Sequence, residues 1–324
     1  MRLAGVAIVR NECDIVEAFV RHNESVLDRL YILDNDSGDG TLEILLRLAA
    51  NRPSIKIGRD NSLPYYQTKK TTKLIKAAFD DEMWDCVFPL DCDEFLMVDD
   101  RGVLEAEIAS LSAEEAGLLV CDHYAPTELD DASEPDPVSR ITHRIAVQPD
   151  LPLFHGKVIA PYALGSLPSV EIGEGNHHIL VADRRMPERW LTSARVAHFP
   201  VRSVEQFLSK VATTRLAWLS RCDYRPSLGH HISIFYAQLR DHPELIPRHL
   251  LDAAFAYFDT YLGPHDRIYE RRLVCDPVQR RGGPLSYLDL AQVKALPRIL
   301  EFAEKIARQL GEANAKLPGR SSES

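Results

Sequence analysis

The sequence predicts an α/β protein in which helices flank a mixed, mostly parallel sheet and a helical C-terminal region follows. The first 100 residues alternate short apolar runs with stretches of helical spacing, at intervals of about 25–30 residues. Such repeats indicate parallel strands joined by right-handed crossovers. After Pro200 the hydrophobic pattern becomes helical. We therefore expect the sheet in the first 200 residues and helices in the rest.

Each predicted element follows from the local pattern of the sequence. Apolar runs predict strands at 3–9, 29–34, 54–58 and 85–90. Periodic segments predict helices at 13–27, 42–50, 66–81, 203–220, 230–240, 244–262 and 286–315. Residues 125–150, rich in Pro, Asp and Glu, predict a long solvated loop such as a lid, and 151–200 predict short strands with turns. We expect a first domain at 1–200, a helical region packed on it at 201–315 and a disordered tail at 316–324.

Composition excludes several classes of protein. The 324 residues include 38 basic and 48 acidic side chains, a net charge of -10, so nucleic-acid binding is not expected as the main function. Apolar stretches stay well short of the ~18 residues that indicate a membrane span, and the N-terminus does not read as a signal peptide. The six cysteines form no C-x-x-C pair. We expect reduced thiols in a cytoplasmic protein.

Charge is unevenly distributed along the chain. Residues 1–194 carry 19 basic and 34 acidic side chains, a net charge of -15, whereas residues 195–324 carry 19 basic and 14 acidic ones, a net charge of +5. The basic part is compatible with a peripheral contact at the inner face of a membrane. A surface of mixed charge without a membrane partner explains the same numbers, so both interpretations stay open.

The sharpest local feature is the sequence Asp91-Cys92-Asp93, directly after the predicted strand at 85–90. Two carboxylates separated by one residue lie on the same side of an extended backbone. They suit a hard divalent cation, Mn²⁺ or Mg²⁺, shared with a diphosphate. Such an ion neutralises the charge that develops on a leaving diphosphate. The alternative is a solvated acidic turn, but the apolar strand before it and the segment Glu94-Phe95-Leu96 after it favour a site.

Two more polar clusters follow predicted strands. Asp34 begins a run that continues through Asp36 to Thr41, and Arg10-Asn11-Glu12 follows the first strand. Ligands of parallel sheets bind beyond the carboxyl ends of the strands, so the three clusters meet at one edge. Carboxylates there can accept hydrogen bonds from a nucleobase or from ribose hydroxyls, and an arginine can bind phosphate. The alternative readings are a helix-entry turn at 10–12 and a chain reversal with a helix cap at 36–41.

Taken together, these motifs resemble glycosyltransferase family 2, in particular a bacterial branch with the sequence Asp-x-Asp-Glu-Phe. An apolar strand precedes Asn-Glu, a second strand precedes Asp-Asn-x-Ser-x-Asp-Gly-Thr, and a fourth precedes Asp-x-Asp-Glu-Phe. Glu174-Gly175-Asn176-His177 and the segment from His198 to Lys210 also resemble that branch. The resemblance covers residues 5–210, and no familiar motif follows it.

The resemblance implies a GT-A-type fold and a metal-dependent transfer of a sugar from a nucleotide-diphosphate donor, with inversion, to a hydroxyl of a glycan or lipid-linked acceptor. It fits polysaccharide biosynthesis in a bacterium. The expected metal ligands are Asp91, Asp93 and a downstream histidine, for which His198 is the first candidate and His177 the second. Donor-binding residues are expected among the strand-end clusters and two later cations, namely Arg10, Asn11, Glu12, Asp34, Asp36, Asp91, Lys157 and Arg202.

Several of these residues also have ordinary structural explanations. His198 lies in an apolar stretch, where a histidine is often a hydrogen-bonded core residue. Lys157 and Arg202 could be surface cations. For the base that deprotonates the acceptor hydroxyl we expect Glu174, with His177 as the second candidate. Glu174 lies between two glycines, so it could equally belong to a turn.

Three other functions are compatible with parts of the pattern. A nucleotidyltransferase also uses a metal and a similar sheet, but the first strand is not followed by a glycine-rich phosphate loop. A phosphatase of the haloacid-dehalogenase type carries Asp-x-Asp on its first strand rather than its fourth. A catalytically silent protein of the same fold, with the helical half used for association, stays open as a binding or scaffold function.

Overall fold

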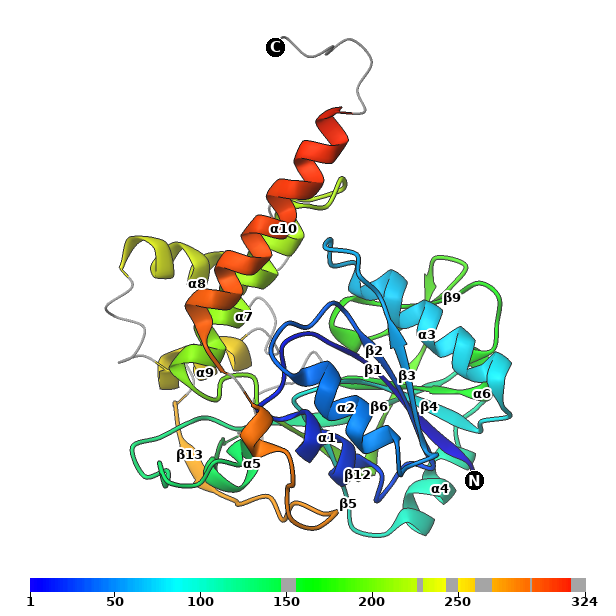
Figure 1. Ribbon diagram of the computed structural model, residues 1–324. Helices are drawn as coiled ribbons and strands as arrows, with labels where there is room; N and C mark the ends of the chain where they lie inside the picture. The colour runs from blue at the N-terminus through cyan, green and yellow to red at the C-terminus, as the bar shows by residue number, and fades with distance from the viewer. Residues whose placement is uncertain (147–155, 226–229, 243–249, 260–269, 292, 316–324) are drawn as a thin grey trace.

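The computed structural model describes residues 1–146, 156–225, 230–242, 250–259, 270–291 and 293–315. Figure 1 shows a central sheet with helices on both sides of it and a group of helices at one end. The predicted fold class, a mixed and mostly parallel sheet flanked by helices with a helical C-terminal region, is confirmed.

The central sheet has eight strands in the order β3-β2-β1-β4-β8-β6-β12-β5. Strand β1 pairs in parallel with β2 and β4, β2 with β3, and β6 with β12, while β8 and β5 run antiparallel to their neighbours. The strand bounds are β1 Leu3–Val9, β2 Arg29–Asp34, β3 Ile55–Arg59, β4 Cys86–Asp91, β5 Glu94–Val98, β6 Ala116–His123, β8 Lys157–Pro161 and β12 Glu188–His198. The four strands predicted before residue 91 therefore form, as expected, within one or two residues of their predicted bounds.

Helices cover both faces of this sheet and bury it. One face packs against α1 Val16–Asn23 and α2 Thr41–Ala49, through a core that includes Phe19, Ile44 and Phe88. The other face packs against α3 Gln67–Asp81 and α6 Tyr162–Gly165, through Ile75 and Leu164. Because both faces are covered, β1 and β4 are almost entirely apolar and buried.

The acidic segment from residue 125 is more ordered than predicted. It contains α5 Pro137–Arg140 and β7 His143–Ile145. The side chain of Asp136 caps α5 and forms an ion pair with Arg280 at 2.6 Å. The prediction of a solvated loop is therefore wrong for residues 136–145, because tertiary contacts bury this acidic residue and its apolar neighbours. Residues 147–150 of the predicted loop lie outside the described residues.

Short elements complete the region between the sheet strands, as the sequence predicts for 156–200. They are β9 Val170–Ile172, the 3₁₀ turn η1 Glu174–Asn176, β10 Ile179–Val181 and β11 Arg184–Arg185. Helix α4 Arg101–Ala109 lies earlier in the chain, between β5 and β6, and was not predicted from the sequence. Strands β9, β10 and β11 form a small antiparallel sheet. The turn η1 lies near the carboxyl end of β4. Lys157 and Gln67 both hydrogen-bond the backbone of Gly175 in η1, and both also contact Asp91, the last residue of β4.

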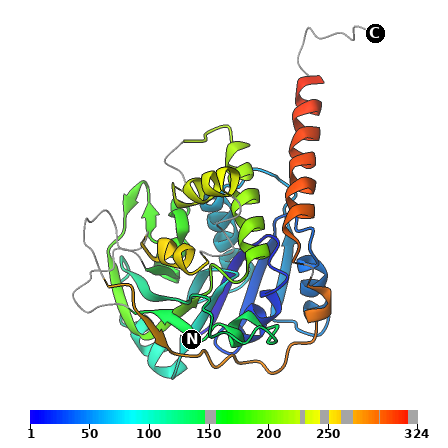
Figure 2. The same ribbon diagram turned by 90° about the vertical axis from the view of Figure 1, so that its left-hand side faces the viewer.

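The C-terminal helices stand over the carboxyl ends of the strands. They are α7 Val204–Leu219, α8 His230–Asp241, α9 Leu250–Asp259 and α10 Ala295–Ala315. Phe207, Phe235 and Phe258 form a separate apolar core among α7, α8 and α9. Figures 1 and 2 show that α10 runs beside α7 and then projects away from the body. The remainder of the predicted helix at 244–262 and the tail at 316–324 lie outside the described residues.

The chain after residue 270 is not wholly helical, because it returns along the sheet domain. Strand β13 Leu273–Cys275 pairs with β7, and a single 3₁₀ turn, η3 Leu288–Leu290, precedes α10. The carboxylate of Glu17 accepts hydrogen bonds from the backbone N–H groups of Ser286 and Tyr287. The helix predicted at 286–315 therefore begins only at Ala295. Among the described helices, none combines the length and the apolar character that a membrane span requires.

A buried histidine connects this returning segment to the sheet. His22 Nε2 donates to the Leu96 carbonyl at 2.9 Å, and its Nδ1 accepts from the Arg281 backbone N–H at 3.2 Å. Both contacts are satisfied only by the neutral ring. Burial lowers the pKa of His22 to about 4. A proton added to Nδ1 would face another N–H donor, so protonation breaks this contact.

We expect acid to destabilise the fold through His22. The unfolded chain takes up a proton near pH 6.5, whereas the folded chain does so only near pH 4, so stability falls as the pH decreases between these values. The free energy of unfolding decreases by about 3 kcal/mol at most. Urea unfolding of wild type and His22→Gln at pH 7.5 and 5 measures it, because glutamine keeps both hydrogen bonds but does not titrate. Equal losses in the two proteins would contradict the assignment.

Candidate active site

A large pocket lies where the ends of β1 and β4 meet the C-terminal helices. Its cavity volume is about 770 Å³, toward the upper end of the range for small-molecule sites, about 300–1,000 Å³. The walls differ in character. The floor is ionic, and the side formed by α7, α8 and α9 is mainly apolar and aromatic. The residues that line the pocket include Arg10, Glu12, Tyr65, Gln67, Asp91, Asp93, Lys157, Glu174, His177, His198, Lys210, Trp218, Phe235 and Tyr257.

The Asp91-Cys92-Asp93 segment forms a tight turn between β4 and β5, not the extended backbone expected from sequence. The turn is stabilised by Glu94, whose Oε2 accepts a hydrogen bond from the backbone N–H of Asp91 at 3.0 Å. As a result the two aspartates contact different groups. Both nevertheless line the same pocket, so the expectation that they serve one site is compatible with the turn.

Asp91 is held mainly by a buried lysine. Lys157 Nζ lies 2.8 Å from Asp91 Oδ2 and 2.5 Å from Glu94 Oε1, and it donates to the carbonyl of Gly175 at 2.9 Å. Only 2% of the Lys157 side chain is exposed. Burial of a lysine at this depth requires compensating acceptors, and these three provide them. Lys157 thus positions Asp91 at the edge of the pocket.

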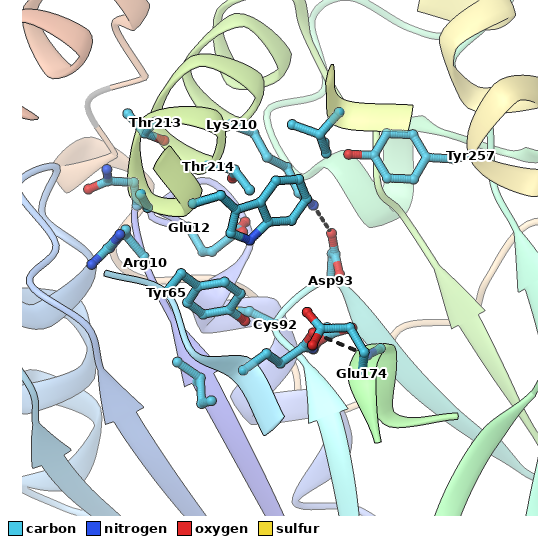
Figure 3. A pocket seen from close by; sticks show the side chains of 18 of the residues that line it. Arg10, Glu12, Tyr65, Cys92, Asp93, Glu174, Lys210, Thr213, Thr214 and Tyr257 are labelled. Atoms are coloured by element: carbon cyan, nitrogen blue, oxygen red, sulfur yellow. Dashed lines mark hydrogen bonds and ion pairs between the residues drawn. The ribbon is translucent and has the colours of Figure 1, made fainter. Parts of the chain in front are cut away.

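Asp93 lies deeper, surrounded by cations. Its Oδ2 is 2.6 Å from Lys210 Nζ and 3.6 Å from the Arg202 guanidinium, and its Oδ1 is 3.4 Å from His198 Nε2. Figure 3 shows Lys210 extending from α7 toward Asp93 across the pocket. Burial alone would raise the pKa of Asp93, but Lys210, His198 and Arg202 hold it well below its usual value. Asp93 is therefore a buried carboxylate that stays ionised.

The pair formed by Asp93 and His198 fits a divalent cation. Two ligand atoms that bind one ion at 2.0–2.2 Å lie about 3 Å apart, close to the 3.4 Å between Oδ1 and Nε2. Carboxylate and imidazole are ligands that Mn²⁺ accepts. Asp91 lines the same pocket and can complete the set. The residues are thus suitable for the expected metal.

Arg202 has a structural role in this arrangement. Its guanidinium contacts Asp14 at 2.7 Å, Glu12 at 2.5 Å and the Phe199 carbonyl at 3.1 Å, and the side chain is completely buried. These partners use most of its five N–H donors. Arg202 is not among the residues that line the pocket. In the structure Arg202 holds Glu12 and Asp93, and its contact with a diphosphate stays a prediction.

The first strand-end cluster also shapes the backbone. Arg10 Nε donates to the Asn35 carbonyl at 2.6 Å, and its guanidinium lies 5.0 Å from the ring of Phe302 on α10. Asn11 has a positive φ of 57°, and its Oδ1 accepts from the Gly38 N–H at 2.9 Å. Arg10, Asn11 and Glu12 also line the pocket, and their contact with the donor stays a prediction.

The second cluster lies under the C-terminal helix. Asp34 is fully buried and accepts from the Ser37 N–H at 3.3 Å, and it is not among the pocket-lining residues. Asp36 pairs with Lys305 of α10 at 2.8 Å. Asp39 and Thr41 hydrogen-bond each other, as expected for residues with a structural role. Contact of Asp34 and Asp36 with a nucleobase or ribose stays a prediction.

Both candidates for the base line the pocket beside Asp91, since Asn176, which lies between them in the sequence, is 3.4 Å from Asp91 Oδ1. Glu174 accepts from the Thr68 hydroxyl at 3.3 Å, and partial desolvation by the walls raises its pKa above the usual value. His177 Nδ1 donates to the Gly156 carbonyl at 2.8 Å. This hydrogen bond leaves the lone pair on Nε2, so His177 also has a basic nitrogen.

Several lining residues were not predicted from sequence. Tyr65 precedes α3, and Gln67, the first residue of α3, contacts both Asp91 and Gly175. The aromatic residues Trp218, Phe235 and Tyr257 come from three different helices after the recognisable motifs end. Their helical spacing is the same for residues that line a pocket and for residues of an apolar core, so nothing in the sequence distinguishes these three from ordinary core residues.

Comparisons with known proteins concern the fold only. No protein-family model matches this chain, and no curated protein sequence matches it significantly. The structure of GalNAc-T7 with UDP, GalNAc and Mn²⁺ is 12% identical to this chain and has a TM-score of 0.38. The matched region covers 81% of this chain and 58% of the GalNAc-T7 chain. TarS from S. aureus is 11% identical and has a TM-score of 0.36, and the matched region covers 88% of this chain and 100% of the TarS chain. The mannosyltransferase PcManGT from Pyrobaculum calidifontis with GDP-Man and Mn²⁺ is 12% identical and has a TM-score of 0.37. The matched region covers 95% of this chain and 80% of the PcManGT chain.

We expect Arg202→Met to destabilise the protein strongly. Removal of this guanidinium leaves buried carboxylates without their partner, which costs about 3–5 kcal/mol. The matched control is Arg47→Met, since Arg47 and its partner Glu43, at 2.7 Å, are 52% and 54% exposed, an interaction worth about 0–1 kcal/mol. Urea unfolding measures both changes. A small change in the free energy of unfolding at Arg202, together with weaker nucleotide binding, would support its role as a diphosphate ligand instead.

Proposed function

We propose that this chain is a metal-dependent glycosyltransferase that moves a sugar from a nucleoside-diphosphate donor to an acceptor hydroxyl. The observation that carries the proposal is the pair of Asp93 Oδ1 and His198 Nε2, 3.4 Å apart on the floor of the pocket. The sequence motifs around Asp34, Asp91 and Glu174 support the same function through their resemblance to family 2 glycosyltransferases.

The donor half of the pocket is the ionic floor. Asp93 and His198 would hold the cation, with Asp91 beside them, and a bound Mn²⁺ or Mg²⁺ supplies charge neutralisation for the leaving diphosphate. Lys210 lines this half and is 25% exposed, so its ammonium can exchange Asp93 for a phosphate oxygen. Lys157 keeps Asp91 in place from below. In this arrangement the protein's own cations lie beside the diphosphate before it departs.

The acceptor half is the side formed by α7, α8 and α9. Trp218, Phe235 and Tyr257 exclude water from the reaction and offer faces against which a sugar ring can pack. Glu174 or His177 would take the proton from the acceptor hydroxyl as it attacks the anomeric carbon on the side opposite the diphosphate. This geometry gives inversion. A glycan or a lipid-linked sugar in bacterial polysaccharide biosynthesis fits this half, at the cytoplasmic face of a membrane.

Metal and nucleotide together are expected to raise the melting temperature. Ligand at a hundredfold excess over its Kd stabilises the native state by about 2.7 kcal/mol. Thermal shift with UDP, GDP and dTDP sugars, each with and without Mn²⁺, measures the effect. Asp93→Ala should abolish its metal-dependent part, while Asp99→Ala, an exposed carboxylate, should not.

A screen for donor hydrolysis then separates the transferase from the other candidates, because slow transfer to water needs no known acceptor. Release of nucleoside diphosphate by wild type but not by Asp93→Ala supports the proposal. Binding without any turnover would indicate the silent scaffold protein instead. Release of pyrophosphate from a nucleoside triphosphate and a sugar 1-phosphate, supplied in place of the donor, would indicate a nucleotidyltransferase. If none of the nucleotides shifts the melting temperature, the proposed function is wrong.

Glu174→Gln is expected to lower kcat by about 10²–10⁴-fold while leaving donor binding unchanged. A base acts only when deprotonated, so the rate should decrease as the pH falls through the raised pKa of Glu174. In the glutamine variant this acidic limb should disappear. His177→Gln is the matched comparison. Unchanged turnover in Glu174→Gln with a strong loss in His177→Gln would assign the base to His177.

A further inference from the structure

We propose that His123 is the positioning residue that orients His198 toward the cation. The inference rests on the proposed function, because His198 is taken as a metal ligand. His123 and His198 end the neighbouring strands β6 and β12 and are directly paired in the parallel register. His123 Nδ1 lies 3.3 Å from His198 Nδ1. The two rings meet edge to face, with centroids 5.0 Å apart.

The directions of the hydrogen bonds follow from the chemistry of imidazole. A histidine binds a metal through a nitrogen that carries a lone pair. The His198 nitrogen nearest Asp93 is Nε2, at 3.4 Å. The proton of the neutral ring must then be on Nδ1, and it is donated to His123 Nδ1. His123 thus selects the tautomer of His198 that can bind the cation and keeps its ring from rotating.

The other metal ligand is oriented in the same way. Lys210 and Arg202 contact Oδ2 of Asp93, which leaves Oδ1 beside His198. Each ligand therefore has a partner on the side away from the proposed cation. Only 1% of His123 and 6% of His198 are exposed, so water does not readily replace the contact between them.

A second arrangement of the same histidines must be distinguished. Ligand atoms of Cys121, His123 and His198 all lie within 4.8 Å of one another, which could hold a softer metal. Cys121, however, packs within the hydrophobic core of the sheet. The geometry of the histidine pair favours the hydrogen bond, and the experiment tests the cluster directly.

The experiment compares Mn²⁺ binding by the full chain in the absence of donor, measured by electron paramagnetic resonance. His123→Phe keeps a ring but removes the acceptor, and we expect it to weaken Mn²⁺ binding by about 10–100-fold. His123→Asn keeps an acceptor oxygen and should recover part of the affinity. Cys121→Ser is the matched control and should bind Mn²⁺ as wild type does. Melting temperatures without metal check that each variant is folded.

A measurement on wild type avoids the risk that His123→Phe does not fold. Long-range ¹⁵N–¹H correlation of labelled histidines in the Mg²⁺-saturated protein reports the tautomer of His198, assigned with His198→Gln. A proton on Nδ1 supports the proposal, and a proton on Nε2 overturns it. Equal Mn²⁺ affinity in His123→Phe and wild type overturns it as well.

Two further outcomes separate this inference from the proposed function. If wild type itself binds no Mn²⁺, the metal site of the proposed function fails and the inference fails with it. If Co²⁺ added to wild type produces a thiolate charge-transfer band that Cys121→Ser abolishes, the metal lies in the Cys121 cluster. In that case the role of His123 as a positioning residue is wrong, while transferase activity is measured separately by donor hydrolysis.

Discussion

The site depends on one buried carboxylate whose charge is balanced by the protein itself. Asp93 lies beneath the pocket with Lys210, Arg202 and His198 around it. Ionisation of a buried carboxylate is costly unless cations or hydrogen-bond donors compensate it. These three residues come from β12, the loop after it and α7, so the charge balance of one side chain connects the sheet to the C-terminal helices. The position of α7, and with it much of the pocket, follows from this compensation.

The same requirement explains why the pocket has two different sides. Parallel strands end together, and their termini expose backbone and polar side chains that are not paired within the sheet. The ionic floor consists of these ends, where each acidic group has a lysine or arginine partner. Helices α7, α8 and α9 have their own apolar core, and their aromatic side chains continue from it to the cavity. A charged donor and a ring-shaped acceptor would therefore occupy chemically distinct surfaces of one cavity.

The C-terminal segment is part of the N-terminal half rather than an appendage. Glu17 accepts two hydrogen bonds from the backbone at 286–287, and Arg298 forms a buried ion pair with Asp39 at 3.2 Å. The turn after β2 is covered by α10 in consequence, which explains why Asp34 and Asp36 do not line the pocket. Position along the chain alone placed these aspartates at the strand ends, but it contained no information on what covers them.

The local pattern of the sequence was sufficient for the strands β1 to β4, the helices between them and the gathering of Asp91 and Asp93 at one sheet edge, because apolar periodicity reflects burial on both faces. The partners of the charged residues were decided by the tertiary structure alone. Lys157, Lys210 and Arg202 are similar cations in the sequence, yet the first holds Asp91, the second faces the pocket and the third is buried among carboxylates. Electrostatic compensation depends on distances of a few ångströms between residues up to 269 positions apart, and no local pattern encodes such distances.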